Sequence, residues 1–212
     1  MKIVSVILAR GGSKGIPNKN IMLLKDKPLI QYSIDASLYS KVHATWVSTD
    51  CTSIKSVALK CGANVLDRPI ELASDTSPSE DALLHFSENV DFDILVFLQP
   101  TSPLILFKDI NTGLEKILSN KYDSLFSVYR EHWLPRWSLN TKPQNWDINN
   151  RPMRQDIDEL LVENGAFYIS TRKQLLKSKL RYGGRIGYVE MPLHRSFQID
   201  TEDDIELVEK LL

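Results

Sequence analysis

The first buried segment of the chain is a run of β-favouring residues that leads directly into a glycine-rich turn. Residues 3–8 read Ile-Val-Ser-Val-Ile-Leu, the near-continuous apolar pattern of a central parallel strand covered on both faces. The turn at 10–15 contains three glycines. A helix is then predicted at about 28–40, because Pro28 suits a first helical turn. A strand, a tight turn and a helix in this order favour an α/β architecture.

The same alternation of strand and helix continues along the chain. Strands are predicted at 44–48, 64–66 and 93–98 in the first half, and at 165–169 and 186–191 in the second. A helix is predicted at about 52–61 and ends before Gly62, and another at about 79–89 has Ser77 as its N-cap. Two more helices are predicted, one opening at Thr171 and one at about 202–212 with Thr201 as its N-cap. This order predicts a single α/β domain over 1–212, built on a doubly wound, mostly parallel sheet.

The regular alternation breaks at about 127–163. Three of the four tryptophans, Trp133, Trp137 and Trp146, lie there together with several prolines. Aromatic residues near prolines mark interaction surfaces more often than disordered linkers. We therefore expect a small excursion from the sheet, either irregular or a β-ribbon that packs against another subunit, that supports dimerisation and gives a homodimer.

Composition and charge limit the class of protein and its partners. With 212 residues, 42% hydrophobic and 25% charged, the chain is typical of one soluble globular domain. Its net charge of −1 favours neither nucleic acid nor an anionic membrane as a partner. No apolar run approaches the roughly 18 residues that span a bilayer, and the two cysteines and four histidines show no disulfide or metal pattern. We expect a cytoplasmic protein.

The glycine-rich turn has the chemistry of a phosphate-binding site. Because it follows a buried strand, it should lie at the carboxyl edge of the sheet, where open α/β sheets bind ligands. Its glycines let backbone N–H groups approach phosphate oxygens, and Arg10, Lys14 and Lys19 bring three positive charges close together. It matches neither the P-loop nor the dinucleotide fingerprint. Alone, the turn predicts a phosphate site without specifying the nucleotide.

At this turn the chain also begins to resemble a known family. Residues 7–20 read ILARGGSKGIPNKN, which is similar to the opening motif of the acylneuraminate cytidylyltransferases, enzymes that make CMP-activated nonulosonic acids such as CMP-sialic acid. The resemblance continues in order through VSTD (47–50), RP (68–69), ELASDT (71–76), QPTSPL (99–104), RQ (154–155), NGAFY (164–168) and IDT (199–201). It covers essentially the whole chain and implies a Rossmann-like nucleotidyltransferase.

The resemblance implies a reaction in which a sugar hydroxyl attacks the α-phosphorus of CTP and pyrophosphate leaves. Such a transfer depends mainly on positioning and charge neutralisation. By family position, Arg10 and Lys19 contact the triphosphate, and Lys19 offsets charge that develops at the α-phosphoryl group. The other nucleotide-binding residues that the resemblance implies are Gly12, Ser13, Lys14, Asn20, Arg68 and Ser79.

The same resemblance implies a site for the nonulosonic acid acceptor. The residues that it places there are Gln99, Thr101, Ser102, Arg154, Gln155, Asn164 and Tyr168. Arg154 counts as catalytic, because it matches an arginine near the acceptor and the phosphates, and a guanidinium suits the carboxylate of the sugar. The excursion at 127–163 is expected to contribute to acceptor binding. For Tyr168, plain core packing on a strand is the alternative.

A divalent cation, Mg²⁺ or Mn²⁺, is the cofactor that the resemblance implies. Relatives usually carry an Asp-x-Asp pair where this chain has Gln198 and Asp200. Since Mg²⁺ binds few carboxylates and takes other oxygens from water and phosphates, Asp200 is the expected catalytic ligand, and the role of Gln198 stays open. Asp203 and Asp204 could replace the missing carboxylate, although capping of the last helix suits them better.

Several alternatives remain at the level of sequence. The acceptor could be sialic, legionaminic or pseudaminic acid, the nucleotide could be GTP, and the CMP-Kdo synthetases are a weaker match to the first turn. A catalytically weak nucleotide-binding homologue is the main alternative, with Gln198 marking an impaired metal site. A sugar-transferring enzyme of similar architecture would need a donor-binding Asp-x-Asp pair after a central strand. Residues 48–50 read Ser-Thr-Asp and contain no such pair, which argues against this alternative.

Overall fold

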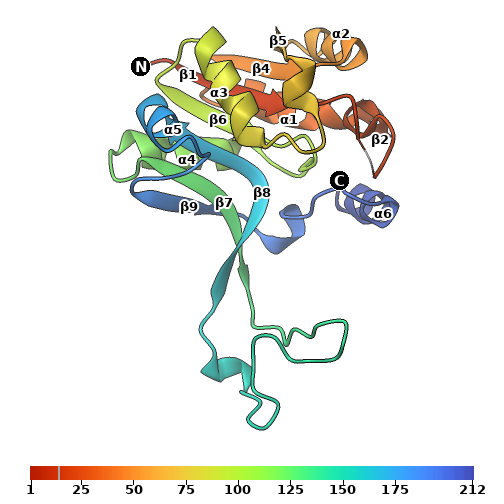
Figure 1. The fold of residues 1–212 in the computed structure, drawn as a ribbon, viewed down its shortest axis with the longest axis vertical. Coiled ribbons are helices and arrows are strands. Elements are labelled where there is room, and N and C mark those ends of the chain that lie inside the picture. The colour runs from red at the N-terminus through yellow and green to blue at the C-terminus, as the bar shows by residue number, and fades with distance from the viewer. Residues whose placement is uncertain (14) are drawn as a thin grey trace.

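A single seven-stranded sheet organises the computed structural model, which describes residues 1–13 and 15–212 (Figure 1). Its strands are β1 (Ile3–Leu8), β4 (Ala44–Thr49), β5 (Asn64–Asp67), β6 (Ile94–Leu98), β7 (Ser124–Glu131), β8 (Leu160–Thr171) and β9 (Ile186–Glu190). They lie in the order β5-β4-β1-β6-β8-β7-β9, and β8 alone of these seven runs antiparallel to its neighbours. The predicted α/β class with a mostly parallel sheet is confirmed.

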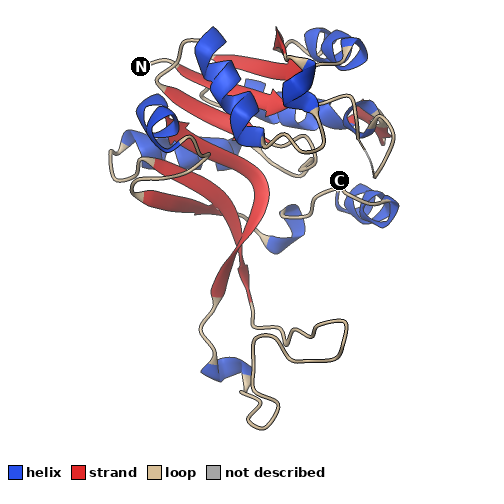
Figure 2. Cartoon of the chain, viewed as in Figure 1, coloured by secondary structure: helices blue, strands red, loops and turns tan. Residues whose placement is uncertain are grey.

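Helices cover both faces of this sheet (Figure 2). They are α1 (Leu29–Leu38), α2 (Thr52–Lys60), α3 (Ser79–Asn89), α4 (Phe107–Leu118), α5 (Arg172–Ser178) and α6 (Glu202–Leu211). Ile3 and Ile7 of β1 pack with α1, α2 and α4 on one face, while Val4 and Val6 pack with α3 and α5 on the other. Burial on both faces explains why β1 reads as an almost unbroken apolar run.

A smaller layer joins the two ends of the chain. Val208 of α6 and Ile199 pack against Leu24 of the hairpin formed by β2 (Leu23–Leu24) and β3 (Lys27–Pro28). Thr201 caps α6, as predicted, by accepting from the Asp204 backbone N–H. None of the helices in the described part of the chain is long and apolar enough to cross a membrane.

Most predicted elements are present within one or two residues. The helix α4, the strand β7 and the β2–β3 hairpin have no counterpart among the predictions. The strand β8 begins at Leu160, before the predicted strand at 165–169, and its ladder with β7 extends into 127–163 as a β-ribbon. The predicted N-cap Ser77 is wrong, because Pro78 is the N-cap of α3 and the Ser77 hydroxyl donates to the Glu71 carbonyl.

Residues 132–159 form an arm that projects from the far end of the β7/β8 ladder, away from the rest of the protein (Figures 1 and 2). Within it, the Trp137 and Trp146 rings meet edge to face with centroids 5.0 Å apart, and the Arg151 guanidinium lies over Trp146. Leu139 and Met153 are exposed. The expected excursion at 127–163 therefore corresponds to this arm and its supporting strands, while its role in dimerisation stays a prediction.

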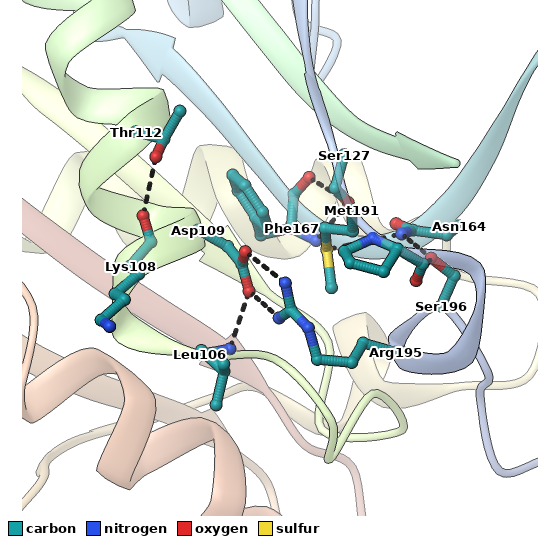
Figure 3. Close-up of polar contacts among 11 residues, drawn as sticks. Leu106, Lys108, Asp109, Thr112, Ser127, Asn164, Phe167, Met191, Arg195 and Ser196 are labelled. Carbon is teal, nitrogen blue, oxygen red and sulfur yellow. Dashed lines mark hydrogen bonds and ion pairs between the residues drawn. The ribbon is translucent and has the colours of Figure 1, made fainter. Parts of the chain in front are cut away.

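A bidentate ion pair fixes the segment that leads from β9 back to α6 (Figure 3). The Arg195 guanidinium donates to both oxygens of Asp109, whose carboxylate also accepts from the Leu106 backbone N–H at the start of α4. Beside it, Asn164 Nδ2 of β8 donates to Ser196 Oγ at 2.9 Å. These contacts hold residues 195–196 against the sheet, four residues before Asp200.

We predict that this ion pair contributes to stability as a coupled unit. Arg195→Met should lower the free energy of unfolding by about 2–4 kcal/mol, because it leaves the largely buried Asp109 carboxylate without its partner. Adding Asp109→Asn should cost little more, giving a clear coupling energy in a double-mutant cycle measured by urea denaturation. Lys210→Met, at an exposed pair with Glu206, is the control and should stay within about 0.5 kcal/mol. Additive losses at Arg195 and Asp109 would contradict the prediction.

Candidate active site

A cleft of about 480 Å³ lies at the carboxyl ends of the parallel strands. The residues after β1, β5 and β6 all reach it, together with the start of α3 and the segment before α6. The predicted site residues in its lining are Arg10, Ser13, Lys19, Asn20, Arg68, Ser79, Gln99, Thr101 and Asp200. Segments far apart in the sequence therefore meet at the edge where α/β proteins bind ligands.

Contacts from neighbouring segments shape the glycine-rich turn. Asp50, which follows β4, accepts from the Gly11 backbone N–H at 3.0 Å, and Asn20 Nδ2 donates to the Arg10 carbonyl at 3.0 Å. A Cβ added to Gly11 would lie 3.0 Å from Cys51 Cβ, whereas one added to Gly12 would meet no atom within 4 Å. The turn thus packs closely against the protein at Gly11 and is open at Gly12.

The guanidinium of Arg10 reaches across to the loop before α3. Its Nη1 donates to the Ser74 carbonyl at 2.6 Å, and its Nη2 lies 2.8 Å from Asp75 Oδ1. Both partners line the cleft, and neither received a role in the sequence analysis. The available signal was the ELASDT motif at 71–76, which contains both of them.

Lys19 joins the first turn to the segment before α6. Its Nζ donates to Asp200 Oδ1 at 2.9 Å and to the Ile199 carbonyl at 3.0 Å. The Lys19 side chain is only 14% exposed, while that of Asp200 is 67% exposed. A Cβ added to Gly15 would lie 2.9 Å from the Asp200 carbonyl, so the two segments approach each other closely. This places one cation and one carboxylate side by side in the cleft.

Arg68 places a third cation in the cleft wall. It is 8% exposed, and its Nη2 donates to the Ser48 carbonyl. Burial lowers the pKa of Arg68 to about 10, and nearby Arg10 acts in the same direction. Among the described residues, its Nε has no hydrogen-bond partner. Because Arg68 also lines the cleft, its positive charge there suits an anionic or carbonyl-bearing ligand.

Asn164 and Tyr168 lie on β8, directly behind the cleft. The β7/β8 ladder shifts register between Phe126 and Val128, opposite residues 164–167 of β8, and Gly165 has a positive φ of +67° there. The Tyr168 ring stacks on Phe97, which lines the cleft, at a centroid distance of 5.5 Å. Its hydroxyl donates to Glu163, and burial raises the pKa of Tyr168. Tyr168 is thus both a packed core residue and the back of the cleft wall.

The remaining predicted residues lie elsewhere. Ser102 is buried, and its hydroxyl has no partner within the described part of the chain. Arg154 and Gln155 are exposed on a short 3₁₀ helix of the arm (Arg154–Asp156), and neither lines the cleft of its own chain. Lys14 is outside the described residues.

The cleft can accommodate a divalent cation at Asp200. Among the described residues, no cluster of three or more histidine, cysteine, aspartate or glutamate side chains could hold a metal by itself. Mg²⁺ and Mn²⁺ bound with a nucleotide need few carboxylates, because phosphates and water complete the shell. Asp204 is engaged in capping, where hydrogen bonds from the Asp200 and Thr201 backbone lower its pKa. Asp200, exposed in the cleft, therefore fits such an ion.

An ion pair that the sequence analysis did not identify supports the wall beside Ser79. Arg181 donates to both carboxylate oxygens of Glu80, at 2.7 and 3.0 Å, and its guanidinium lies over the Phe97 and Tyr168 rings. The hydrogen bond from Arg181 holds the pKa of Glu80 below its ordinary value. The pair thereby braces the aromatic side of the cleft.

This lowered pKa predicts how stability depends on pH. The ionised Glu80 stabilises the fold above its unfolded pKa near 4.5, and the contribution is lost as pH falls through the lower folded pKa. Glu80→Gln should lower the free energy of unfolding by about 1.5–3 kcal/mol at neutral pH. Urea denaturation should show the difference from wild type shrinking below about pH 4.5. Glu115→Gln, at an exposed pair with Lys41, is the control, and a Glu80→Gln difference that persists unchanged into strong acid would contradict the assignment.

Comparison with known proteins identifies the family. A family model described as Cytidylyltransferase matches residues 4–212. N-acylneuraminate cytidylyltransferase A of Danio rerio is 41% identical over 98% of this chain and 50% of its own length, and the Streptococcus agalactiae (serotype III, strain NEM316) enzyme is 34% identical over 96% and 52%. The chain thus spans about half the length of these curated relatives. Post-translational flagellin modification protein B of Campylobacter coli is 34% identical over 100% of this chain and 95% of its own.

Solved structures agree on the fold. CMP:2-keto-3-deoxy-manno-octonic acid synthetase complexed with CTP superposes with a TM-score of 0.78 at 20% identity, covering 100% of this chain and 98% of the other. A 4-diphosphocytidyl-2C-methyl-D-erythritol synthase from Anaerococcus prevotii gives a TM-score of 0.67 at 10% identity, covering 99% and 95%. At these identities the structures support the architecture alone. From the family match and the sequence relatives, the chain belongs to the cytidylyltransferase family, with N-acylneuraminate cytidylyltransferases among its relatives.

Proposed function

We propose that the protein couples CTP to a nonulosonic acid, giving a CMP-sugar and pyrophosphate. The observation that carries this proposal is the cleft in which Arg10, Lys19 and Arg68 converge opposite Asp200 at the carboxyl edge of the sheet. The net charge of the chain is −1, so this positive charge is local. Three cations beside two carboxylates, Asp75 and Asp200, suit a metal-bound triphosphate.

In this proposal the first turn holds the triphosphate. Backbone N–H groups at the open Gly12, together with Ser13, Lys14 and Arg10, bind phosphate oxygens. The other nucleotide contacts come from Asn20, Arg68 and Ser79, which hold the base and ribose; the buried, partly unpaired Arg68 donates to a carbonyl or hydroxyl oxygen there. GTP is the alternative nucleotide, since the choice of base depends on few contacts.

The chemical step needs correct positioning and neutralised charge. The acceptor hydroxyl oxygen forms a bond to the α-phosphorus, the bond from that phosphorus to the bridging oxygen of the pyrophosphate breaks, and the hydroxyl proton is released. Lys19, whose ammonium Asp200 orients at 2.9 Å, offsets charge on the α-phosphoryl oxygens. Mg²⁺ or Mn²⁺ held by Asp200 would supply further charge neutralisation on the phosphates.

The acceptor binds next to Gln99, Thr101 and Ser102, with Asn164 and Tyr168 behind it. Arg154 and Gln155 complete the site from the arm of a second copy, with Arg154 binding the acceptor carboxylate. Two observations support this homodimer: both residues lie on the arm and outside the lining of their own cleft, and the arm exposes Leu139 and Met153. In this homodimer each chain is one domain over residues 1–212, and its arm completes the acceptor site of the other copy.

The names of the relatives suggest two kinds of acceptor. The name of the Campylobacter coli relative, which has nearly the same length, links it to flagellin modification, and this fits an acceptor of the legionaminic or pseudaminic type used for surface glycans. The relatives named N-acylneuraminate cytidylyltransferases fit a sialic acid. Because CTP is a cytoplasmic metabolite, we expect the protein in the cytoplasm.

Pyrophosphate release tests the activity. Wild-type protein with Mg²⁺ should release pyrophosphate with CTP and at least one acid from a panel of sialic, legionaminic and pseudaminic acids, and much less with other nucleotides. Lys19→Met should lower kcat by about 10²–10³-fold, because it removes charge stabilisation of the transition state. Lys60→Met, at the exposed end of α2, is the control and should keep full activity. Binding of CTP without turnover on any acceptor would support a catalytically weak homologue instead.

Complementation between inactive subunits tests the shared site. Co-expressed Lys19→Met and Arg154→Ala chains should recover about one quarter of wild-type activity, since half of the dimers are mixed and each mixed dimer contains one intact site. Each variant alone should be nearly inactive. Analytical ultracentrifugation of both variants should show dimers. A mixture that stays inactive while forming dimers would mean that Arg154 acts within its own chain.

A further inference from the structure

Gln198 bridges two elements of the acceptor end of the cleft. Its Nε2 donates to the Asn164 carbonyl of β8, and its Oε1 accepts from Thr101 Oγ1 at 3.4 Å in the loop after β6. Both partners are residues that the sequence analysis placed at the acceptor. The carboxamide therefore uses its donor on one element and its acceptor on the other.

The backbone of β8 is shaped to receive this amide. Gly165 has a φ of +67°, and a Cβ added there would overlap Gln198 Nε2 and lie 3.3 Å from Gln99 Oε1. The Gln198 amide thus lies against the bare Cα of Gly165, close to Gln99. The register shift of the β7/β8 ladder falls at the same place, opposite residues 164–167. Gln99, Thr101 and Asn164, all assigned to the acceptor, surround this one side chain.

Asp200 has different surroundings. Its carboxylate contacts Lys19 of the first turn, two residues along the chain from Gln198, and it is exposed in the cleft. An aspartate or glutamate at 198 would have no N–H to donate and would place a negative charge against the Asn164 carbonyl oxygen. The hydrogen bond from Gln198 to the Asn164 carbonyl thus requires an amide, and the amide oxygen lies 3.4 Å from Thr101 Oγ1.

We propose that Gln198 is a positioning residue for the acceptor, fixing the Asn164–Gly165 backbone against the loop that carries Gln99 and Thr101, and that it is not a ligand of the divalent cation. This inference rests on the proposed cytidylyltransferase activity. It makes Asp200 the single carboxylate at the metal. It also means that the glutamine is a functional residue of the acceptor end and not the remnant of a lost metal ligand.

Two near-isosteric substitutions separate the two roles. Gln198→Met removes both hydrogen bonds without adding charge, and Gln198→Glu keeps an oxygen acceptor but removes the donor to Asn164. The measurements are the affinity of Mn²⁺ in the presence of CTP, followed by electron paramagnetic resonance without acceptor, and the steady-state kcat and KM for the best wild-type acceptor. Gln31→Met in α1 is the matched control, and Asp200→Asn is the reference for loss of a metal ligand.

Both Gln198 variants should bind Mn²⁺ within about threefold of wild type and raise the acceptor KM at least tenfold, with the KM for CTP unchanged. Asp200→Asn should weaken Mn²⁺ at least tenfold. Tighter Mn²⁺ binding by Gln198→Glu, or a loss in Gln198→Met equal to that in Asp200→Asn, would overturn the inference. An unchanged acceptor KM would overturn it as well. Absence of CTP binding in the wild type would instead overturn the proposed function, so the two failures are distinguishable.

Discussion

The ion pair between Lys19 and Asp200 joins the two ends of the chain at the cleft. The two residues lie 181 positions apart in the sequence. One partner follows the first strand, and the other precedes the last helix. Close approach of Gly15 to the Asp200 carbonyl and packing of α6 against the β2–β3 hairpin hold the same two segments together. The return of the chain to its beginning therefore brings Asp200 to the cleft that the first turn lines.

Electrostatics inside the cleft follow from unequal pairing of the cations. Lys19 and Arg10 each contact an aspartate, whereas Arg68 is buried, donates to a backbone carbonyl and keeps an unpartnered Nε within the described residues. Burying a cation in this way costs stability. A ligand oxygen would offset that cost, so the cleft is preorganised for an electron-rich ligand although the chain as a whole is nearly neutral.

Local sequence signals predicted most of the fold, and the parts that they missed depend on distant contacts. The strand at 3–8 and the cap at Thr201 follow from nearby residues, and the structure confirms them. By contrast, α4 contains Gly113, which weakens the helical signal; its helix is secured by close packing on Phe167 and Ile169 of β8. For the candidate site, residue types in the first turn predicted Arg10 and Lys19 at a phosphate site, and the family resemblance implied Arg68; all three line the cleft. They could not predict the bridge between Gln198 and Asn164, or the distance of Arg154 from the cleft, because both depend on how β8 is placed.

The continuous strand β8 has a consequence for how such a protein can diversify. Asn164 and Tyr168 of β8 lie behind the cleft, where the Tyr168 ring stacks on Phe97 of its lining, and the Leu160 end of β8 supports the arm. The segments proposed to hold the triphosphate are different ones, after β1, β5 and β6. Under the proposed function, substitutions in the arm would therefore act on the acceptor half of the site alone. Acceptor choice and subunit pairing would then be set along this one ribbon, separately from the half that handles the nucleotide.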